Sequence, residues 1–113
     1  MSQKQFSPNA NVIEPSDWTL FYGFIVRRNL RPSAVTVTGS ATTIPATNLA
    51  SRYVLVIQNL SSDNIYIGDI TVTTANGMKL VPNAVLSIMV EDSVQVYGIS
   101  DGTSSNVRIL EGS

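Results

Sequence analysis

Hydrophobic and polar residues alternate in short runs over residues 34–113, and turn-forming residues separate these runs. Valine, isoleucine, threonine and tyrosine are frequent in the runs, as expected of strands that bury one face. The clearest example is the pair of apolar runs at residues 53–60 and 64–68, which flank Ser61, Ser62 and Asp63. Serine and aspartate side chains bond to nearby backbone groups and favour a chain reversal. We therefore interpret residues 53–68 as two strands of a hairpin and their turn.

The same pattern predicts further short strands along the chain. They are residues 34–38, 42–47, 70–74, 78–81, 85–90, 94–99 and 106–110. Pro45 cannot donate to a ladder, so the strand at residues 42–47 belongs on a sheet edge. Asn76 and Gly77 predict a tight hairpin turn between residues 70–74 and 78–81.

Side-chain alternation also predicts which residues face the core. Those expected to point inward are Leu86, Ile88, Val90, Val94 and Val96. With about nine short strands and no convincing helix, two sheets packed face to face, or one closed sheet, must cover the apolar faces. We predict an all-β fold, a small antiparallel β-sandwich of jelly-roll type over residues 33–113. An extended N-terminal arm, residues 1–32, precedes it.

The predicted arm, residues 1–32, differs from the rest of the chain in charge. Its basic and acidic residues give 4 − 2 = +2, whereas the remainder has 3 − 6 = −3. Within the arm, residues 16–29 fit a helix, because their apolar residues recur at the i, i+3, i+4, i+7 spacing of one helical face. Aromatic and β-branched residue types, together with Gly23, fit a strand or an extended segment instead. Both interpretations stay open, and residue type slightly favours the extended one.

The arm is the best candidate for a segment that binds a partner. Ordering it costs about 1–2 kcal/mol per residue, more than its aromatic side chains alone can offset by burial, so it needs backbone pairing or further burial. Other subunits are the favoured place for that docking. The candidate residues are Phe6, Trp18, Phe21, Tyr22, Phe24, Arg27, Arg28 and Arg31. The other interpretation is that residues 18–26 form one more strand of the same domain's core.

Arg27, Arg28 and Arg31 form the one basic cluster of the sequence. Guanidinium groups suit the carboxylates of a protein partner and the phosphates of nucleic acid. Three arginines on a chain of net charge −1 are few for nucleic acid, so a protein contact or simple solvent exposure is favoured. We predict no membrane binding either, because the longest apolar run, residues 18–26, is too short to cross a bilayer as a helix.

The sequence contains no cysteine and no histidine. Thiol nucleophiles, thiolate metal ligands and the usual general base of hydrolases are therefore excluded. The carboxylates in predicted turns are Asp63, Asp69, Glu91, Asp92 and Asp101. A calcium site around Asp63 or Asp101 is conceivable, but the regular acidic spacing of a dedicated calcium loop is missing, so turn chemistry is favoured. We predict no enzymatic activity, no metal and no cofactor.

A longer pattern is found over residues 55–82. It includes Val-Ile-Gln-Asn-Leu-Ser-Ser-Asp-Asn-Ile-Tyr-Ile-Gly-Asp, then Val-Thr-Thr, then Asn-Gly-Met-Lys-Leu. Residues 94–100 and 107–111 continue it, so that it covers about the C-terminal two thirds of the chain. In these residues the chain resembles small virion proteins of tailed bacteriophages.

The resemblance implies a compact β-domain that serves as a capsid decoration, cement or head-fibre-like protein, often trimeric. On this basis we expect a homotrimer on the capsid surface of a virion, bound to the major capsid protein. One alternative is a carbohydrate- or receptor-binding module, in which Tyr53, Tyr66 and Tyr97 would stack on sugars. Another is a structural component of the tail or connector.

Overall fold

The structure is a computed structural model that describes residues 27–113. Its strands are β2 (Leu30–Val37), β3 (Thr42–Ile44), β4 (Val54–Asn59), β5 (Ile65–Gly68), β6 (Met78–Leu80), β7 (Val85–Ile88), β8 (Val96–Ser100) and β9 (Ser105–Gly112). The described residues form no helix, and thus none that could cross a membrane. The strands and the turns between them account for the whole domain.

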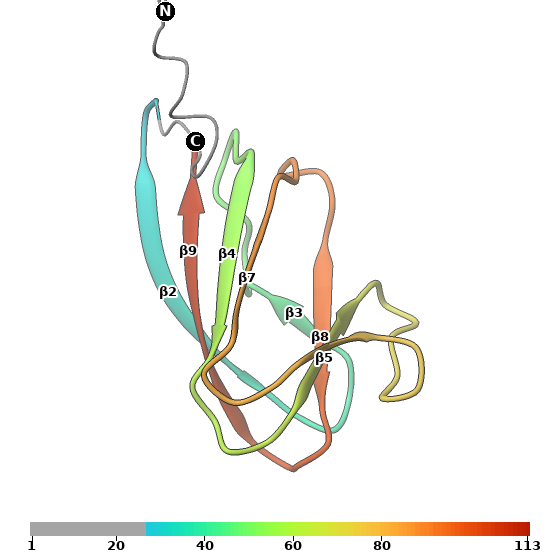
Figure 1. Cartoon of the computed structure of the whole chain (residues 1–113). Coiled ribbons are helices and arrows are strands. Elements are labelled where there is room, and N and C mark those ends of the chain that lie inside the picture. Colours follow the sequence, from blue (N-terminus) through green and yellow to red (C-terminus); the bar gives the residue numbers. More distant parts are fainter. Residues whose placement is uncertain (1–26) are drawn as a thin grey trace, which may run out of the picture.

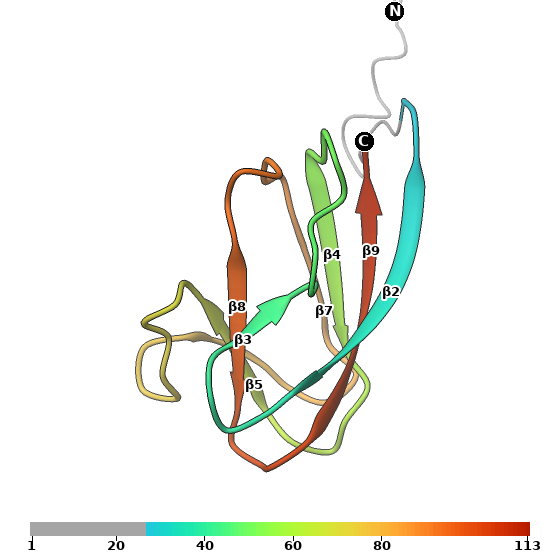
Figure 2. The same ribbon diagram turned by 180° about the vertical axis from the view of Figure 1, so that it is seen from behind.

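Two four-stranded antiparallel sheets face each other (Figures 1 and 2). The first sheet has the order β2-β9-β4-β7 and the second has the order β3-β8-β5-β6. The pairs β2 with β9, β3 with β8, β4 with β7, and β5 with β6 nest inside one another along the chain. This nesting of eight strands in two sheets is the topology of a jelly roll. The predicted all-β sandwich of jelly-roll type is confirmed.

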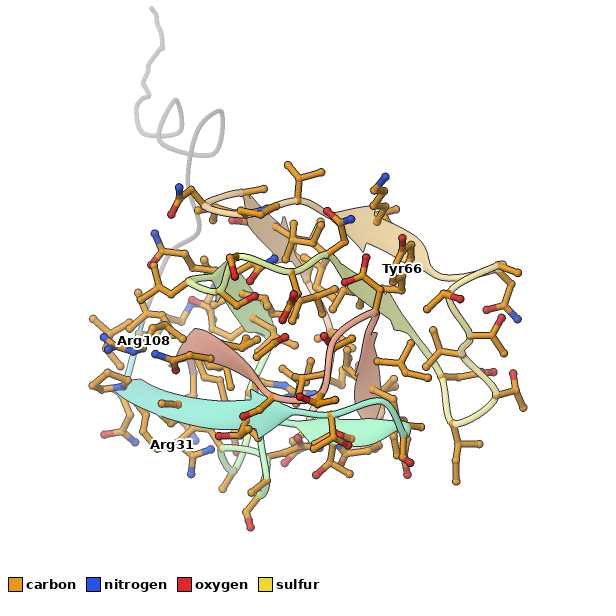
Figure 3. All side chains as sticks on the ribbon, turned by 90° about the horizontal axis from the view of Figure 1, so that it is seen from below. Arg31, Tyr66 and Arg108 are labelled. Carbon is orange, nitrogen blue, oxygen red and sulfur yellow. The ribbon has the colours of Figure 1, made fainter. Side chains whose placement is uncertain are left out.

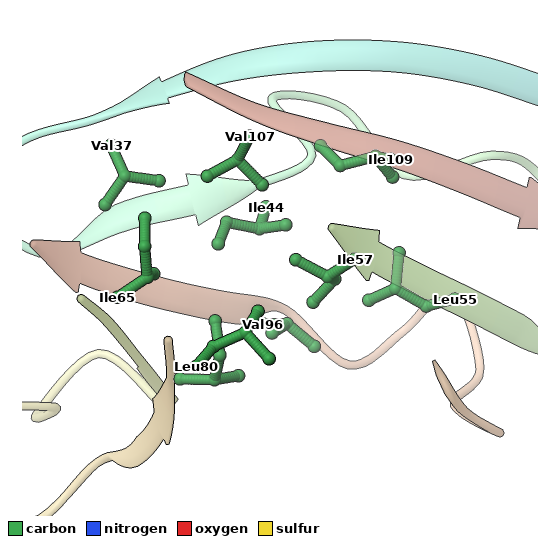
Figure 4. Packing of buried hydrophobic residues seen from close by; sticks show 10 residues of the cluster. Val37, Ile44, Leu55, Ile57, Ile65, Leu80, Val96, Val107 and Ile109 are labelled. Carbon is green, nitrogen blue, oxygen red and sulfur yellow. The ribbon is translucent and has the colours of Figure 1, made fainter. Parts of the chain in front are cut away.

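The core fills the space between the sheets with aliphatic side chains from both (Figure 4). Strand β9 shows how the sequence achieves this, because Val107 and Ile109 are buried whereas their neighbours Asn106, Arg108 and Leu110 are exposed. A period of two places alternate side chains on opposite faces of a strand. The buried cluster consists of Val37, Ile44, Leu55, Ile57, Ile65, Ile67, Leu80, Val96, Val107 and Ile109.

The predicted hairpin at residues 53–68 is wrong in its pairing, although its two strands and its turn exist. β4 belongs to the first sheet and β5 to the second, so residues 60–64 form a corner between the sheets. The buried Asn59 amide organises this corner by donating to the carbonyl oxygens of Asp63 at 2.8 Å and Leu80 at 2.9 Å. Its side-chain oxygen accepts from the backbone N–H of Ser61 at 2.9 Å. A corner and a hairpin both need polar reversal residues, so composition does not separate them.

The strand predicted at residues 70–74 is also wrong, because these residues lie in the loop between β5 and β6. Asp69 Oδ1 accepts from the Thr71 N–H at 2.8 Å, and Asn76 Oδ1 accepts from the Thr73 N–H at 2.8 Å. Such local bonds offer the backbone an alternative to a ladder. β6 instead pairs directly with β5, with Ile65 opposite Leu80, so Asn76 and Gly77 end a loop and do not form a two-residue hairpin turn.

The predicted edge position of the strand at residues 42–47 is confirmed, since β3 lies at one end of its sheet and stops before Pro45. Leu86, Ile88 and Val90 pack against the core as predicted. Val96 is buried, but Val94 is 50% exposed and its predicted inward orientation is wrong. Val94 precedes β8 and lies in a turn, so the strand alternation does not reach it.

Three residues of the predicted arm, at positions 30–32, lie in β2. The sequence places the end of the arm at Pro32, because the regular spacing of short strands begins after this residue. In β2 it occupies a position that does not bond to β9, because the Ser113 N–H donates to the Asn29 oxygen at 2.9 Å and fixes the alternation along the pair. The strand therefore passes through the proline without losing a hydrogen bond.

We predict that Gly98→Ala destabilises the domain by about 1–3 kcal/mol through overpacking. Gly98 lies in β8 opposite Thr42 and Ile67, and an added Cβ would approach Ile44 Cδ1 to 2.5 Å. Urea unfolding followed by circular dichroism measures the change. Gly39→Ala is the control, because its nearest atom lies at 3.7 Å. Equal stability of the two variants would contradict this account of the core.

Candidate functional site

The aromatic residues predicted to bind a partner, Phe6, Trp18, Phe21, Tyr22 and Phe24, lie outside the described residues. Their role stays a prediction. Arg27 and Arg28 are exposed, and their backbone N–H groups both donate to the Ser113 oxygen, at 2.9 and 2.7 Å. The base of the arm is therefore bound to the end of β9, with two guanidinium groups available to solvent.

Arg31 does not share this exposed position. Its Nε lies 3.1 Å from Glu111 Oε1, and its terminal nitrogen also donates to Glu111 and to the Thr47 oxygen. The Arg31 side chain is 36% exposed and the Glu111 side chain is fully buried. Of the three arginines in the predicted cluster, Arg31 is thus engaged within its own domain.

Glu111 receives a second cation from Arg52, which is also fully buried. Arg52 Nη1 lies 3.1 Å from Glu111 Oε2, and the Leu49 N–H donates to the same oxygen at 3.0 Å. Both carboxylate oxygens therefore have partners, as a buried charge requires. We call Arg31, Arg52 and Glu111 the buried ion network.

Arg52 uses its other donors to hold a neighbouring loop. Its Nη2 donates to the carbonyl oxygens of Glu91 at 2.9 Å and Val94 at 2.8 Å, and its Nη1 donates to Asn48 Oδ1 at 3.0 Å. The guanidinium thus joins the loop before β4 to the loop before β8. A planar group with several donors in fixed directions suits this arrangement, which a lysine would not reproduce.

Sequence reasoning missed the buried ion network, although one signal for it was present. Glu111 continues the inward series of Val107 and Ile109 along β9. A carboxylate at an inward-facing position of the strand is buried, and a buried carboxylate needs cationic partners. Arg52, just before β4, has no comparable periodic signal, since it lies outside the strand.

We predict that Arg52→Ala lowers the free energy of unfolding by about 3–5 kcal/mol, because Glu111 loses a buried partner and three carbonyl oxygens lose a donor. Guanidinium chloride unfolding measures the loss. Arg108→Ala is the control, since Arg108 is exposed and a change within about 0.5 kcal/mol is expected there. Similar losses of unfolding free energy for both variants would show that the buried ion network contributes no more to stability than an exposed arginine does.

A second polar cluster lies at the corner between the sheets. The Ser105 hydroxyl donates to Asp63 Oδ2 at 3.2 Å and lies 2.6 Å from the Ser100 hydroxyl. Asp101 accepts from the backbone N–H and the side-chain amide of Asn64, at 3.0 and 2.9 Å. The two acidic positions considered for calcium are thus close to one another, but protein donors bond to their oxygens. Within residues 27–113, no group of three or more acidic, histidine or cysteine side chains could hold a metal ion.

Asp69, in the loop between β5 and β6, has a pKa that its hydrogen bonds shift. A hydrogen bond from the Thr71 hydroxyl, and then one from the Thr71 N–H, lower the pKa of Asp69 below its ordinary value. A lowered pKa in the folded chain means that the ionised form stabilises the loop, and this contribution is lost as the pH falls through the lowered pKa. Because Asp69 is fully exposed, solvent screening keeps the effect on stability small.

We predict that Thr71→Val raises the pKa of Asp69 toward its ordinary value, because the hydroxyl donor at 2.5 Å is removed while the backbone donor remains. An NMR titration of the Asp69 carboxyl carbon measures the shift. Thr74→Val is the control, since Thr74 makes no described bond to Asp69. An unchanged Asp69 pKa in Thr71→Val would contradict the assignment.

The three tyrosines considered for sugar binding do not form one surface. Tyr66 and Tyr97 lie on the outer face of the second sheet, because Tyr66 pairs with Ile99 and Tyr97 pairs with Gly68 in the same register. Tyr53 precedes β4 in the first sheet, and its hydroxyl is buried without a hydrogen-bond partner. In Figure 3, Tyr66 is far from Arg31 at the opposite side of the domain.

Large apolar side chains are exposed on the outside of the first sheet. Leu30 in β2, Leu110 in β9, Val85 in β7 and Met89 just after β7 are between 37% and 69% exposed. Leu110 stands between Pro32 and Val56 in the register of the neighbouring strands. We call Leu30, Val85, Met89 and Leu110 the outer apolar face, and a patch of this kind is typical of an interaction surface.

The chain was compared with protein-family models, with curated proteins and with solved structures, and none of the three comparisons found a match. The functional conclusion therefore depends on the fold, the charges and the exposed surface described above.

Proposed function

We propose that this chain is a non-enzymatic structural protein of a tailed-bacteriophage virion, a decoration or cement protein that binds the major capsid protein and stabilises the shell. The observation that carries the proposal is a jelly roll whose first sheet has an outer apolar face and holds the base of the arm at one end. Jelly rolls occur in viral capsid proteins, and also in lectins and cupins, so the topology supports this by analogy of fold.

The composition and the exposed chemistry support a structural role. Charged residues make up 13% of the chain, about half the usual share, so neutral polar groups cover most of its surface. Such a surface suits a protein that packs against others in an assembly. The sequence has no histidine or cysteine, and the buried Glu111 is fully engaged with two arginines.

The partner-binding segment in this proposal is the arm together with the outer apolar face. Arg27 and Arg28 are exposed at the end of the first sheet, where they can meet carboxylates of the capsid protein. The aromatic residues of the arm precede them directly in the chain. A homotrimer at a three-fold position of the capsid would present three such arms to the shell.

The proposal predicts that the purified full chain binds isolated phage capsids that lack it, saturably and at a fixed number of copies per shell. Trp18→Ala with Phe21→Ala should weaken this binding about thirtyfold or more, as expected when buried aromatic anchors are lost at an interface. Cosedimentation at varied protein concentration measures the affinity. Tyr66→Ala is the control, because Tyr66 lies on the outer face of the other sheet.

Two results would overturn the proposal. Absence of capsid binding, combined with saturable binding to a glycan that Tyr66→Ala abolishes, would favour the carbohydrate-binding alternative. Labelling of the chain on the tail or the connector of intact particles, and not on the shell, would favour the other structural role.

A further inference from the structure

The two sheets leave four strands at their edges: β2 and β7 in the first sheet, and β3 and β6 in the second. An edge strand presents unpaired backbone N–H and C=O groups that can accept a further strand. Natural proteins block such edges with proline, with lysine, or by keeping the strand very short. The residues of each edge strand therefore show whether that edge is blocked against a further strand.

Three of the edges carry such blocks. In β2, Pro32 occupies a position that faces away from β9 and so leaves a gap in the row of outward donors. β3 has three residues and Pro45 follows it directly. β6 also has three residues, and Lys79 is one of them.

The β7 edge carries none of these blocks. The Val90 N–H donates to the Tyr53 oxygen at 3.0 Å, and the Asn59 N–H donates to the Ala84 oxygen at 3.0 Å, so even-numbered residues bond to β4. In antiparallel pairing the odd-numbered residues then face outward. These are Val85, Ser87 and Met89, and residues 83–90 contain no proline and no charge. Val85 is 55% and Met89 is 69% exposed beside this edge.

The chain also contains a segment suited to such an edge. Residues 18–26 are an uncharged run in which all residues except Leu20 and Gly23 are aromatic or β-branched, which is the composition of a strand. This run ends next to Arg27, which is bound to Ser113 at the end of the first sheet. Leu30, Gly112 and Val54 stand in one row across that end, where β7 also finishes. The point where the run joins the domain and the end of β7 are thus at the same end of the first sheet.

Within one copy, however, the segment cannot lie fully along β7. β2 and β7 are opposite edges of a four-stranded sheet, which puts them about 14 Å apart at about 4.8 Å per strand. Crossing that width takes about four extended residues, 23–26, so that about five of the nine residues are left to pair with β7 of the same copy. A second copy has no such restriction and offers the complete run.

We propose that residues 18–26 of one copy add as a strand to the β7 edge of a second copy of this chain. Alternate side chains of the added strand then lie beside Val85 and Met89 and extend the outer apolar face, and the backbone bonds to the outward groups of β7. Donation from one copy to the next is a head-to-tail contact, which three copies can close into a ring. The proposal depends on the homo-oligomer of the proposed function and names the contact that would build it.

Cysteine cross-linking tests the contact on the full chain, because the sequence has no cysteine of its own. Tyr22→Cys protein is mixed with Ser87→Cys protein under mild oxidation, and a covalent dimer of the two variants is expected. The control replaces Ser87→Cys with Ala34→Cys, at an outward position of the proline-blocked β2 edge. A yield no higher than the control would overturn the proposal. So would a Tyr22→Cys/Ser87→Cys double variant that cross-links within single chains.

An edge-blocking variant tests the same contact without cross-linking. Ser87→Pro removes an N–H that faces away from β4, so the domain should stay folded while strand addition is blocked. We expect the dissociation constant of the oligomer to rise about tenfold or more, measured by light scattering over a dilution series. Ala34→Pro is the matched control on β2, and equal oligomer affinity of both variants would overturn the proposal.

The outcomes separate this proposal from the capsid proposal. If cross-linking fails while the chain still binds capsids, the strand contact is wrong and the capsid role stands. If cross-linking succeeds while capsid binding is absent, the strand contact stands and the capsid role is wrong.

Discussion

The rest of the structure depends on the ion pairs that the buried Glu111 carboxylate makes with Arg31 and Arg52. Glu111 lies on β9, the strand between β2 and β4, and it binds Arg31 of β2 and Arg52 just before β4. Arg52 then holds the loop before β8 through backbone oxygens. A buried charge of this kind is stable only with all its partners present. One end of the sandwich is therefore held by charge-assisted bonds that reach both sheets.

The other end of the sandwich is held by hydrogen bonds from amide and hydroxyl groups, some of which are accepted by the Asp63 and Asp101 carboxylates. The Asn59 amide joins β4 to the corner before β5 and to the end of β6, and Ser100 and Ser105 meet where β8 leads into β9. Between these polar ends the core is purely aliphatic. The polar bonds at the two ends hold the loops and strand ends in place. Packing of isoleucine, leucine and valine between them supplies most of the stability.

The sequence predicted the strands well because a period of two is a local property of each run. The two errors of assignment have different causes, because strand pairing is not a local property and local side-chain bonds can replace a strand ladder. Residues 61–63 mark a reversal equally well for a hairpin and for a corner, and only the burial of Asn59 distinguishes them. In residues 70–74 the alternation of isoleucine, valine and threonine imitates a strand, but Asp69 and Asn76 bond to the loop backbone instead. Arg31 was grouped with Arg27 and Arg28 by adjacency, whereas its contact with Glu111 spans 80 positions.

The place of β9 in the first sheet has a consequence for synthesis of the chain. β9 is the last described strand, yet it pairs with both β2 and β4, and the contact of Asn29 with Ser113 joins residues 84 positions apart. Pairings this distant in sequence make folding slow. On the ribosome, β2 and β4 are made long before the strand that fits between them. The nascent chain therefore carries unpaired, aggregation-prone strands until β9 emerges, and the first sheet can form only then.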